Sequence, residues 1–239
     1  MDKGTIKEIA FFSNSLQEEI NLLIYIPANY SPLYQYHLCI ASDGRDYFQL
    51  GGIARLADQL IDDYEIEQTI FVGVPYRDRK DRARKYIPTG DLYDSYMRYL
   101  AYELVPYLDT EYSTKQLASS RTLMGDSMAA TASLMGVLHY PNIFGKAIMH
   151  SPYVDEHVLE KMESFTHTES IFLYHVIGSE EVQVTMKDNQ IKDFLTPNRM
   201  LHELIVSKNI PTFYDEFSGN HTWIYWKPDL QRTLIKIFG

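Results

Sequence analysis

Short apolar runs alternate with longer amphipathic stretches along the chain, and this alternation predicts β-strands and α-helices in turn. Strands are expected where a β-rich run stops at a turn signal. They cover Thr5–Phe12, Glu19–Ile26, Tyr36–Ala41, Thr69–Val74, Arg121–Met124, Lys146–Met149, Ile171–Ile177 and Thr212–Phe217. Helices are expected where apolar residues recur at helical spacing, at about Ile53–Asp62, Leu92–Leu108, Met128–Leu138, Asn198–Ser207 and Asp229–Phe238. Pro106 should kink the second of these helices or close it early.

The order of these elements predicts one α/β domain that spans residues 1–239, because the sequence contains no repeat, low-complexity tract or linker. Five of the strands are separated by helices, which favours parallel pairing. The apolar run Ile70–Val74 is typical of a strand that is buried on both faces of a sheet. We therefore expect a mostly parallel central sheet, with functional groups at the carboxyl ends of its strands.

Composition and charge exclude several classes of protein. With a formal net charge of −10, the chain lacks the cationic surface of a general nucleic-acid binder. It also lacks the run of about 20 apolar residues that a membrane-spanning helix requires, so neither nucleic acid nor a membrane is an expected partner. The N-terminal residues lack the apolar segment of a secretory signal, and the single cysteine, Cys39, cannot form an internal disulfide. A cytoplasmic location is therefore expected.

One basic cluster stands out in this acidic chain. It comprises Arg77, Arg79, Lys80, Arg82, Arg84 and Lys85. Because Asp78 and Asp81 interrupt it, a solvated surface loop is the favoured interpretation. The alternative is that the cluster borders a binding site for an anionic substrate.

A candidate nucleophile lies between a predicted strand and a predicted helix, in the segment Gly125–Ala129. Ser127 is at its centre, where a nucleophile elbow places its serine. The residues two positions before and after the serine must be small, because the strand and the helix approach each other there. Gly125 meets this requirement, whereas Ala129 replaces the usual second glycine. A serine that caps the helix is the structural alternative.

His221 is the candidate base for Ser127, because a hydroxyl becomes a good nucleophile only when a base removes its proton. It follows the strand Thr212–Phe217 and a glycine turn, and it lies late in the chain, as the order serine, acid, histidine requires. We assign structural or surface roles to the other histidines, which are His37, His139, His150, His157, His167, His175 and His202.

The acid that orients the imidazole is expected in the loop that follows the strand before His221. That loop offers Glu180 and Glu181, and position favours Glu181 over Glu180. Two backbone N–H groups are expected to stabilise the developing oxyanion. One belongs to Met128, at the N-terminus of the helix after Ser127, and the other to Arg45, in the glycine-containing loop after the third strand.

Taken together, these segments resemble the Putative esterase family of the α/β-hydrolases, which includes esterase D, the enterochelin esterases and the mycolyltransferases. The matching segments span nearly the whole chain: Ser42–Gly44, Val72–Val74, Arg84–Pro88, Glu103–Leu108, Gly125–Met128, Phe144–Gly145, Ser151–Pro152, Gly178 with Glu181, and Gly219–Trp223. The resemblance implies a three-layer α/β-hydrolase sandwich. In relatives the acid lies three residues after the strand-ending glycine, which matches Glu181, although many relatives have aspartate there.

The resemblance also implies hydrolysis of a carboxylic ester through an acyl-enzyme intermediate, with no metal or organic cofactor. The absence of an obvious long lid insertion favours small or short-acyl esters as substrates. A siderophore trilactone esterase, an acyltransferase and a non-catalytic binding protein of the same fold are the alternatives. A GDSL-type hydrolase is disfavoured, since its serine block usually lies near the N-terminus. Relatives often form homo-oligomers, so self-association is an open expectation.

Overall fold

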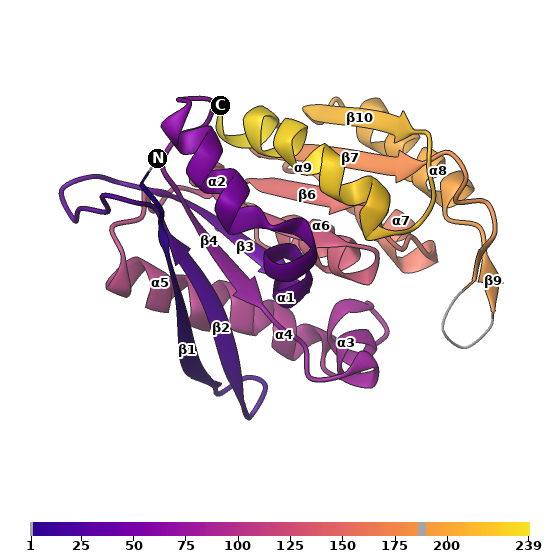
Figure 1. Cartoon of the computed structure of the whole chain (residues 1–239). Helices are drawn as coiled ribbons and strands as arrows, with labels where there is room; N and C mark the ends of the chain where they lie inside the picture. The colour runs from indigo at the N-terminus through magenta and orange to yellow at the C-terminus, as the bar shows by residue number, and fades with distance from the viewer. Residues whose placement is uncertain (1, 186–189) are drawn as a thin grey trace.

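The computed structural model of the chain describes residues 2–185 and 190–239, and an eight-stranded β-sheet runs through its centre (Figure 1). The strands lie in the order β1-β2-β4-β3-β5-β6-β7-β10 across the sheet. They comprise β1 (Thr5–Ser13), β2 (Glu18–Ile26), β3 (His37–Ser42), β4 (Thr69–Val74), β5 (Arg121–Asp126), β6 (Lys146–His150), β7 (Phe172–Gly178) and β10 (Thr212–Phe217). Each coincides with a predicted strand to within about two residues at either end.

Most of the sheet is parallel, as the sequence predicts. Neighbouring strands pair in parallel from β4 through β3, β5, β6 and β7 to β10, whereas β1 pairs with β2 and β2 with β4 in antiparallel fashion. A short turn suffices to join the antiparallel pair β1 and β2, but parallel neighbours need the longer crossovers that the helices supply. A separate hairpin is formed by β8 (Val184–Thr185) and β9 (Ile191–Lys192).

Helices cover both faces of the sheet, which confirms the expected three-layer arrangement (Figure 1). One face is covered by α2 (Ile53–Asp62) and α9 (Trp223–Phe238). The other is covered by α4 (Tyr93–Tyr99), α5 (Val105–Glu111), α6 (Met128–His139), α7 (Glu156–Ser164) and α8 (Leu195–Ser207). Strand periodicity separates the two cores: in β3, Leu38 and Ile40 contribute to one, and Cys39 and Ala41 to the other.

All of the basic cluster except Arg77 lies in a helix, α3 (Arg79–Tyr86), so the loop interpretation is wrong. The side chain of Asp78 accepts hydrogen bonds from the N–H groups of Lys80 and Asp81, and this cap starts the helix. The charges that resembled a solvated loop are in part buried: Lys85 is 3% exposed and contacts both Glu18 and Asp81. Charge density alone therefore misidentified this segment, because four of its six cations form ion pairs within the fold.

Two helices extend beyond their predicted limits. The long helix does not close at Pro106, because a π-helical turn at Leu100–Leu104 precedes the proline and α5 continues to Glu111. A π-helical turn shifts the register of the backbone hydrogen bonds and so accommodates Pro106, which has no N–H to donate. The last helix starts at Trp223 rather than Asp229, with Pro228 inside it, and Trp226 in this added turn is buried.

Cys39 lies in the middle of the sheet and is completely buried. Burial raises the pKa of its thiol, because the thiolate would lose its solvation in the apolar core. Among the described residues, no helix is both long enough and apolar enough to cross a bilayer.

Candidate active site

The carboxyl ends of β5, β7 and β10 bring three of the predicted site residues together at one edge of the sheet. The Oγ atom of Ser127 lies 2.9 Å from Nε2 of His221. The Nδ1 atom of the same imidazole lies 2.6 Å from Oε2 of Glu181. The three side chains therefore form a continuous hydrogen-bonded series, in the geometry by which an acid orients a base and a base activates a hydroxyl.

Ser127 occupies a strained backbone conformation between β5 and α6. Its φ of 54° and ψ of −124° are rare for a residue with a side chain, and its N–H donates to the carbonyl of His150 at 2.9 Å. The sharp turn requires glycine at position 125, because a Cβ there would overlap the backbone of Ala129. Ala129 itself is fully buried in the core, so the departure from glycine at that position is accommodated.

Glu181 is fully buried, whereas Glu180 is exposed, so the structure places only the former beside His221. The second carboxylate oxygen, Oε1, accepts hydrogen bonds from Ser151 Oγ at 2.6 Å and from the N–H of Gly178 at 2.9 Å. A side chain at position 178 would overlap this oxygen, which explains the glycine. With both oxygens bonded, the carboxylate has a fixed orientation towards the imidazole.

Aromatic rings hold the His221 imidazole in place. Its ring centroid lies 4.4 Å from that of Phe194 and 4.9 Å from that of Trp226, which meets it edge-on at 84°. The indole N–H of Trp226 donates to Ser151 Oγ at 2.9 Å. Ser151 therefore links the ring that contacts His221 to the carboxylate of Glu181, and its contribution was not evident from sequence.

The two predicted oxyanion donors are placed differently. Met128 is the first residue of α6 and lines the cavity beside Ser127, at a helix end where N–H groups lack intrahelical acceptors. Arg45 lies in the short helix α1 (Gly44–Asp46) after β3, with its side chain exposed. Its neighbours Asp43 and Asp46 line the cavity, although Arg45 is not among the lining residues.

An ion pair not anticipated from the sequence joins the loop after β3 to α3. Arg82 Nε lies 2.9 and 2.8 Å from the two carboxylate oxygens of Asp43, and Arg82 Nη2 donates to the backbone carbonyl of Asp126 at 3.1 Å. Burial of Asp126 and the nearby charge of Asp43 hold the pKa of the Asp126 carboxyl well above its usual range, despite the opposing effect of Arg82. The wall next to the nucleophile thus combines one charged pair with a buried carboxyl group whose pKa is raised.

Ser127 and His221 border a cavity of about 660 Å³. A volume of this order suits a small-molecule ligand. The lining residues are Asp43, Asp46, Tyr76, Arg79, Arg82, Ala83, Ile87, Asp126, Ser127, Met128, Tyr153, Val184, Thr185, Lys192, His221, Thr222, Trp223 and Trp226. Aromatic rings and cationic side chains from α3, β9 and α9 therefore surround the nucleophile.

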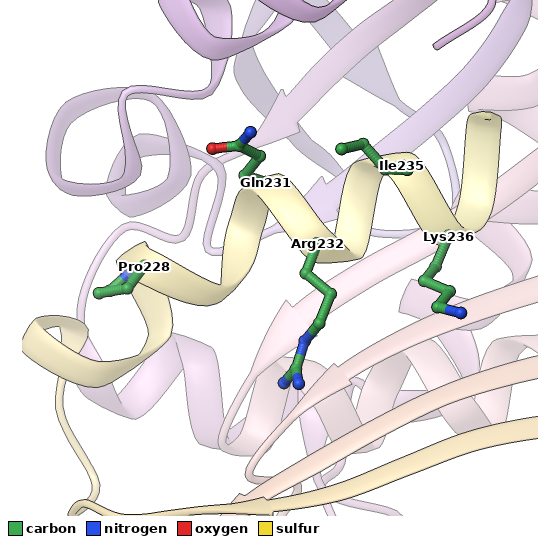
Figure 2. A pocket seen from close by; sticks show the side chains of 5 residues that line it. All are labelled: Pro228, Gln231, Arg232, Ile235 and Lys236. Atoms are coloured by element: carbon green, nitrogen blue, oxygen red, sulfur yellow. The ribbon is translucent and has the colours of Figure 1, made fainter. Parts of the chain in front are cut away.

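A second hollow lies on the outer surface of α9 (Figure 2). All of its lining residues come from that one helix: Pro228, Gln231, Arg232, Ile235 and Lys236. It shares no residue with the cavity at Ser127, and it has no convergent polar groups from other elements. Within residues 2–185 and 190–239, no group of three or more His, Cys, Asp or Glu side chains has the arrangement of a metal site.

Comparisons with known proteins agree with this geometry. Residues 13–237 match the model of the family described as Putative esterase. The chain belongs to this esterase family. It is also 47% identical, over 234 residues that cover 98% of each chain, to the protein named "Uncharacterized protein YjcH" from Bacillus subtilis (strain 168). Family membership confirms the resemblance seen in the sequence and identifies the chain as a hydrolase of the esterase type.

Solved structures similar to this esterase share its fold. The enterobactin esterase FES from Shigella flexneri superimposes with a TM-score of 0.82 at 18% identity, covering 98% of this chain and 59% of that one. A ferulic acid esterase superimposes with a TM-score of 0.80 at 13% identity, covering 99% and 98%. BES from Bacillus cereus superimposes with a TM-score of 0.79 at 16% identity, covering 100% and 97%. This chain thus spans little more than half of the Shigella protein but nearly all of the other two.

Proposed function

We propose that this esterase is a serine carboxylesterase that hydrolyses small or short-acyl esters through an acyl-enzyme intermediate. One observation carries the proposal: Ser127 Oγ, His221 Nε2, His221 Nδ1 and Glu181 Oε2 form an unbroken hydrogen-bonded series beside a cavity of ligand size. A helix-capping role for Ser127 is not favoured, since its side chain makes no capping hydrogen bond to α6.

In the acylation step, His221 takes the hydroxyl proton as Ser127 Oγ forms a bond to the ester carbonyl carbon. The carbonyl electron pair moves to oxygen, and the N–H groups of Met128 and Arg45 stabilise that charge. Glu181 stabilises the imidazolium. The tetrahedral intermediate then collapses, the bond to the alcohol oxygen breaks, and His221 returns its proton to the departing alcohol.

Deacylation repeats these steps with water as the nucleophile. His221 removes a proton from water, whose oxygen attacks the acyl carbon, and the bond from that carbon to Ser127 Oγ breaks as the proton returns to the serine. The products are the carboxylic acid and the free enzyme. With an alcohol in place of water the same chemistry transfers the acyl group, so transferase activity differs only in the acceptor.

Bulkier aromatic esters form a second candidate class. Tyr76, Tyr153 and Trp223 line the cavity and supply aromatic contacts for an aromatic acyl or alcohol group. Two structural neighbours carry names that refer to esters of this kind, an enterobactin esterase and a ferulic acid esterase. A series of p-nitrophenyl esters of increasing acyl length, run beside a feruloyl ester and a siderophore lactone, ranks these classes by kcat/KM.

A fluorophosphonate probe tests the nucleophile directly. The wild-type protein should be labelled and should release a burst of p-nitrophenol from p-nitrophenyl acetate, whereas Ser127→Ala should do neither. Ser207→Ala, in an exposed position of α8, is the matched control and should behave like the wild type. Labelling that persists in Ser127→Ala would overturn the assignment, and a folded wild-type protein without label or burst would favour a non-catalytic binding role.

Product analysis in the presence of added alcohols separates hydrolysis from acyl transfer. Free acid as the main product supports the hydrolase, and a new ester supports the transferase. A single domain across residues 1–239, a cytoplasmic location and self-association stay predictions from the sequence.

A further inference from the structure

Charged side chains of both signs line the cavity, and the acidic ones are Asp43, Asp46 and Asp126. Arg79, Arg82 and Lys192 are the cationic side chains that line it. Arg82 is neutralised by Asp43, with which it forms two hydrogen bonds from Nε. Among the ion pairs of the described residues, none includes Arg79 or Lys192. Two cations therefore face the cavity without a carboxylate partner from the described part of the chain.

Lys192 is held in a defined position near the nucleophile. Its Nζ donates to the hydroxyl of Tyr153 at 3.0 Å and lies 4.7 Å from the centroid of the same ring. The N–H of Tyr153 in turn donates to the carbonyl of Ser127 at 3.2 Å. The ammonium group is thus connected to the nucleophile through a single intervening residue, and two of its three N–H donors are not used by Tyr153.

The rest of the molecule makes this arrangement unusual. The chain has a formal net charge of −10, so the two cations at its cavity that lack an ion-pair partner among the described residues are opposite in sign to its overall charge. Half-buried Lys192 on β9 and exposed Arg79 on α3 come from elements far apart in the sequence, yet both line the cavity of Ser127. A carboxylate on the substrate would supply the ion-pair partner that neither cation has among the described residues.

We propose that the substrate of this enzyme is an anionic ester, whose carboxylate is bound by the ammonium group of Lys192 with a further contribution from Arg79. The inference rests on the proposed esterase function and names its substrate class. Two arrangements share this chemistry, since the carboxylate can belong to the acyl half or to the alcohol half of the ester. The Tyr153 hydroxyl, already bonded to Lys192, is a second donor for that carboxylate.

Matched pairs of substrates test whether the enzyme prefers a negatively charged ester and show which half of the ester carries the charge. p-Nitrophenyl hemisuccinate and p-nitrophenyl butyrate differ by a carboxylate on the acyl half, and 4-acetoxybenzoate and its methyl ester differ by one on the alcohol half. The wild-type enzyme should favour the acidic member of at least one pair in kcat/KM. Lys192→Gln should reduce that preference by about tenfold, mainly through KM, because a charge-assisted hydrogen bond is lost. Lys192→Arg should retain most of it.

Lys236→Gln is the control, since it removes the same charge from the exposed surface of α9. It should leave the preference unchanged. A wild-type enzyme that favours the neutral member of both pairs, or a Lys192→Gln variant that keeps the wild-type preference, would overturn the inference while leaving the esterase intact.

Binding of the stable succinate monoanilide, measured by calorimetry, gives a readout that needs no turnover. Wild-type protein should bind it more tightly than Lys192→Gln by about the same factor. If no ester is hydrolysed and the fluorophosphonate does not react, the esterase proposal fails on its own. Equal affinity of the two proteins for the anilide refutes binding of an acyl-half carboxylate by Lys192, and 4-acetamidobenzoate tests the alcohol half in the same way.

Discussion

Arg82 and Asp43 form an ion pair that is shielded from solvent and lies beside the nucleophile, with their side chains 13% and 1% exposed. The same guanidinium group donates to the carbonyl of Asp126, the residue before Ser127. One side chain of α3 therefore fixes the distance between the loop that carries the Arg45 N–H and the turn that carries Ser127. Because an oxyanion is stabilised only when its donors are aligned in advance, this contact bears directly on the proposed reaction.

Replacing Arg82 should therefore lower turnover more than substrate binding. Arg82→Gln removes the two-oxygen contact with Asp43, and we expect kcat to fall by roughly 10²-fold, the order associated with one oxyanion donor. Arg84→Gln is the matched control on the same helix, because Arg84 pairs with Asp91 at the surface. In Arg82→Ala, added guanidinium should restore part of kcat. A parallel loss of folding stability without any rescue would indicate a purely structural role.

Glu180 and Glu181 are neighbours in the chain, and comparing their variants tests which of them is the catalytic acid. Glu181→Gln keeps the shape of the side chain but removes the charge that stabilises the His221 imidazolium, and kcat/KM should fall by roughly 10³- to 10⁴-fold. Glu180→Gln should have little effect, since Glu180 is exposed. Hydrolysis of p-nitrophenyl acetate measures both. Similar kinetics in the two variants would contradict the assignment of Glu181.

The sharp backbone turn at Ser127 limits the size of the residues that can flank it. In Gly125→Ala the new methyl group would overlap the backbone of Ala129, which no side-chain rotation can relieve. We expect a loss of about 2–3 kcal/mol in unfolding free energy, together with slower fluorophosphonate labelling. Ala129→Gly introduces the residue usual at that position and should keep labelling at a cost of about 1 kcal/mol. Denaturant titration and labelling rates test both; unimpaired Gly125→Ala would show that the turn tolerates a side chain.

Asp229 should contribute to stability in a pH-dependent way. Burial would raise the pKa of its carboxyl group, but contacts with His150, Tyr174 and Arg232 outweigh burial and lower it to about 2. Because the folded pKa lies below the unfolded value of ~4, the contribution is complete above pH ~4 and is lost as the pH falls through about 2. It amounts to about 2 kcal/mol at neutral pH.

Asp229→Asn should therefore be less stable at pH 7 and should lose less stability than the wild type between pH 4 and 2. Urea unfolding at several pH values measures the difference. Asp62→Asn, at the exposed end of α2, serves as the control. An unchanged acid dependence in Asp229→Asn would mean that other carboxylates dominate acid unfolding.

The sequence predicts the site residues that directly follow the end of a strand. Ser127, Glu181 and His221 each follow a strand of the parallel sheet in a fixed order along the chain, so local pattern and topology together suffice to nominate them. The strands β3 to β7 are readable because strands buried on both faces have largely apolar runs, whereas the less buried β1, β2 and β10 are recognised as β-rich runs that end at turn signals.

Arg82 could not be singled out in this way. It is one of six basic residues within a short segment, and its partner Asp43 lies 39 residues away, so nothing local shows which cation is buried. Ser151 is similar, since its contact with Glu181 depends on how β6 and β7 pair. Side chains that act through long-range contacts become visible only once the strands are placed.

The enclosure of Cys39 has a practical consequence. Because the native thiol is inaccessible in the folded protein, a cysteine introduced at the surface would be its sole reactive sulfhydryl. Thr185 is exposed on the rim of the cavity and suits this purpose. A maleimide dye attached at Thr185→Cys would report the arrival of a ligand by fluorescence in otherwise unaltered protein, without any background from position 39.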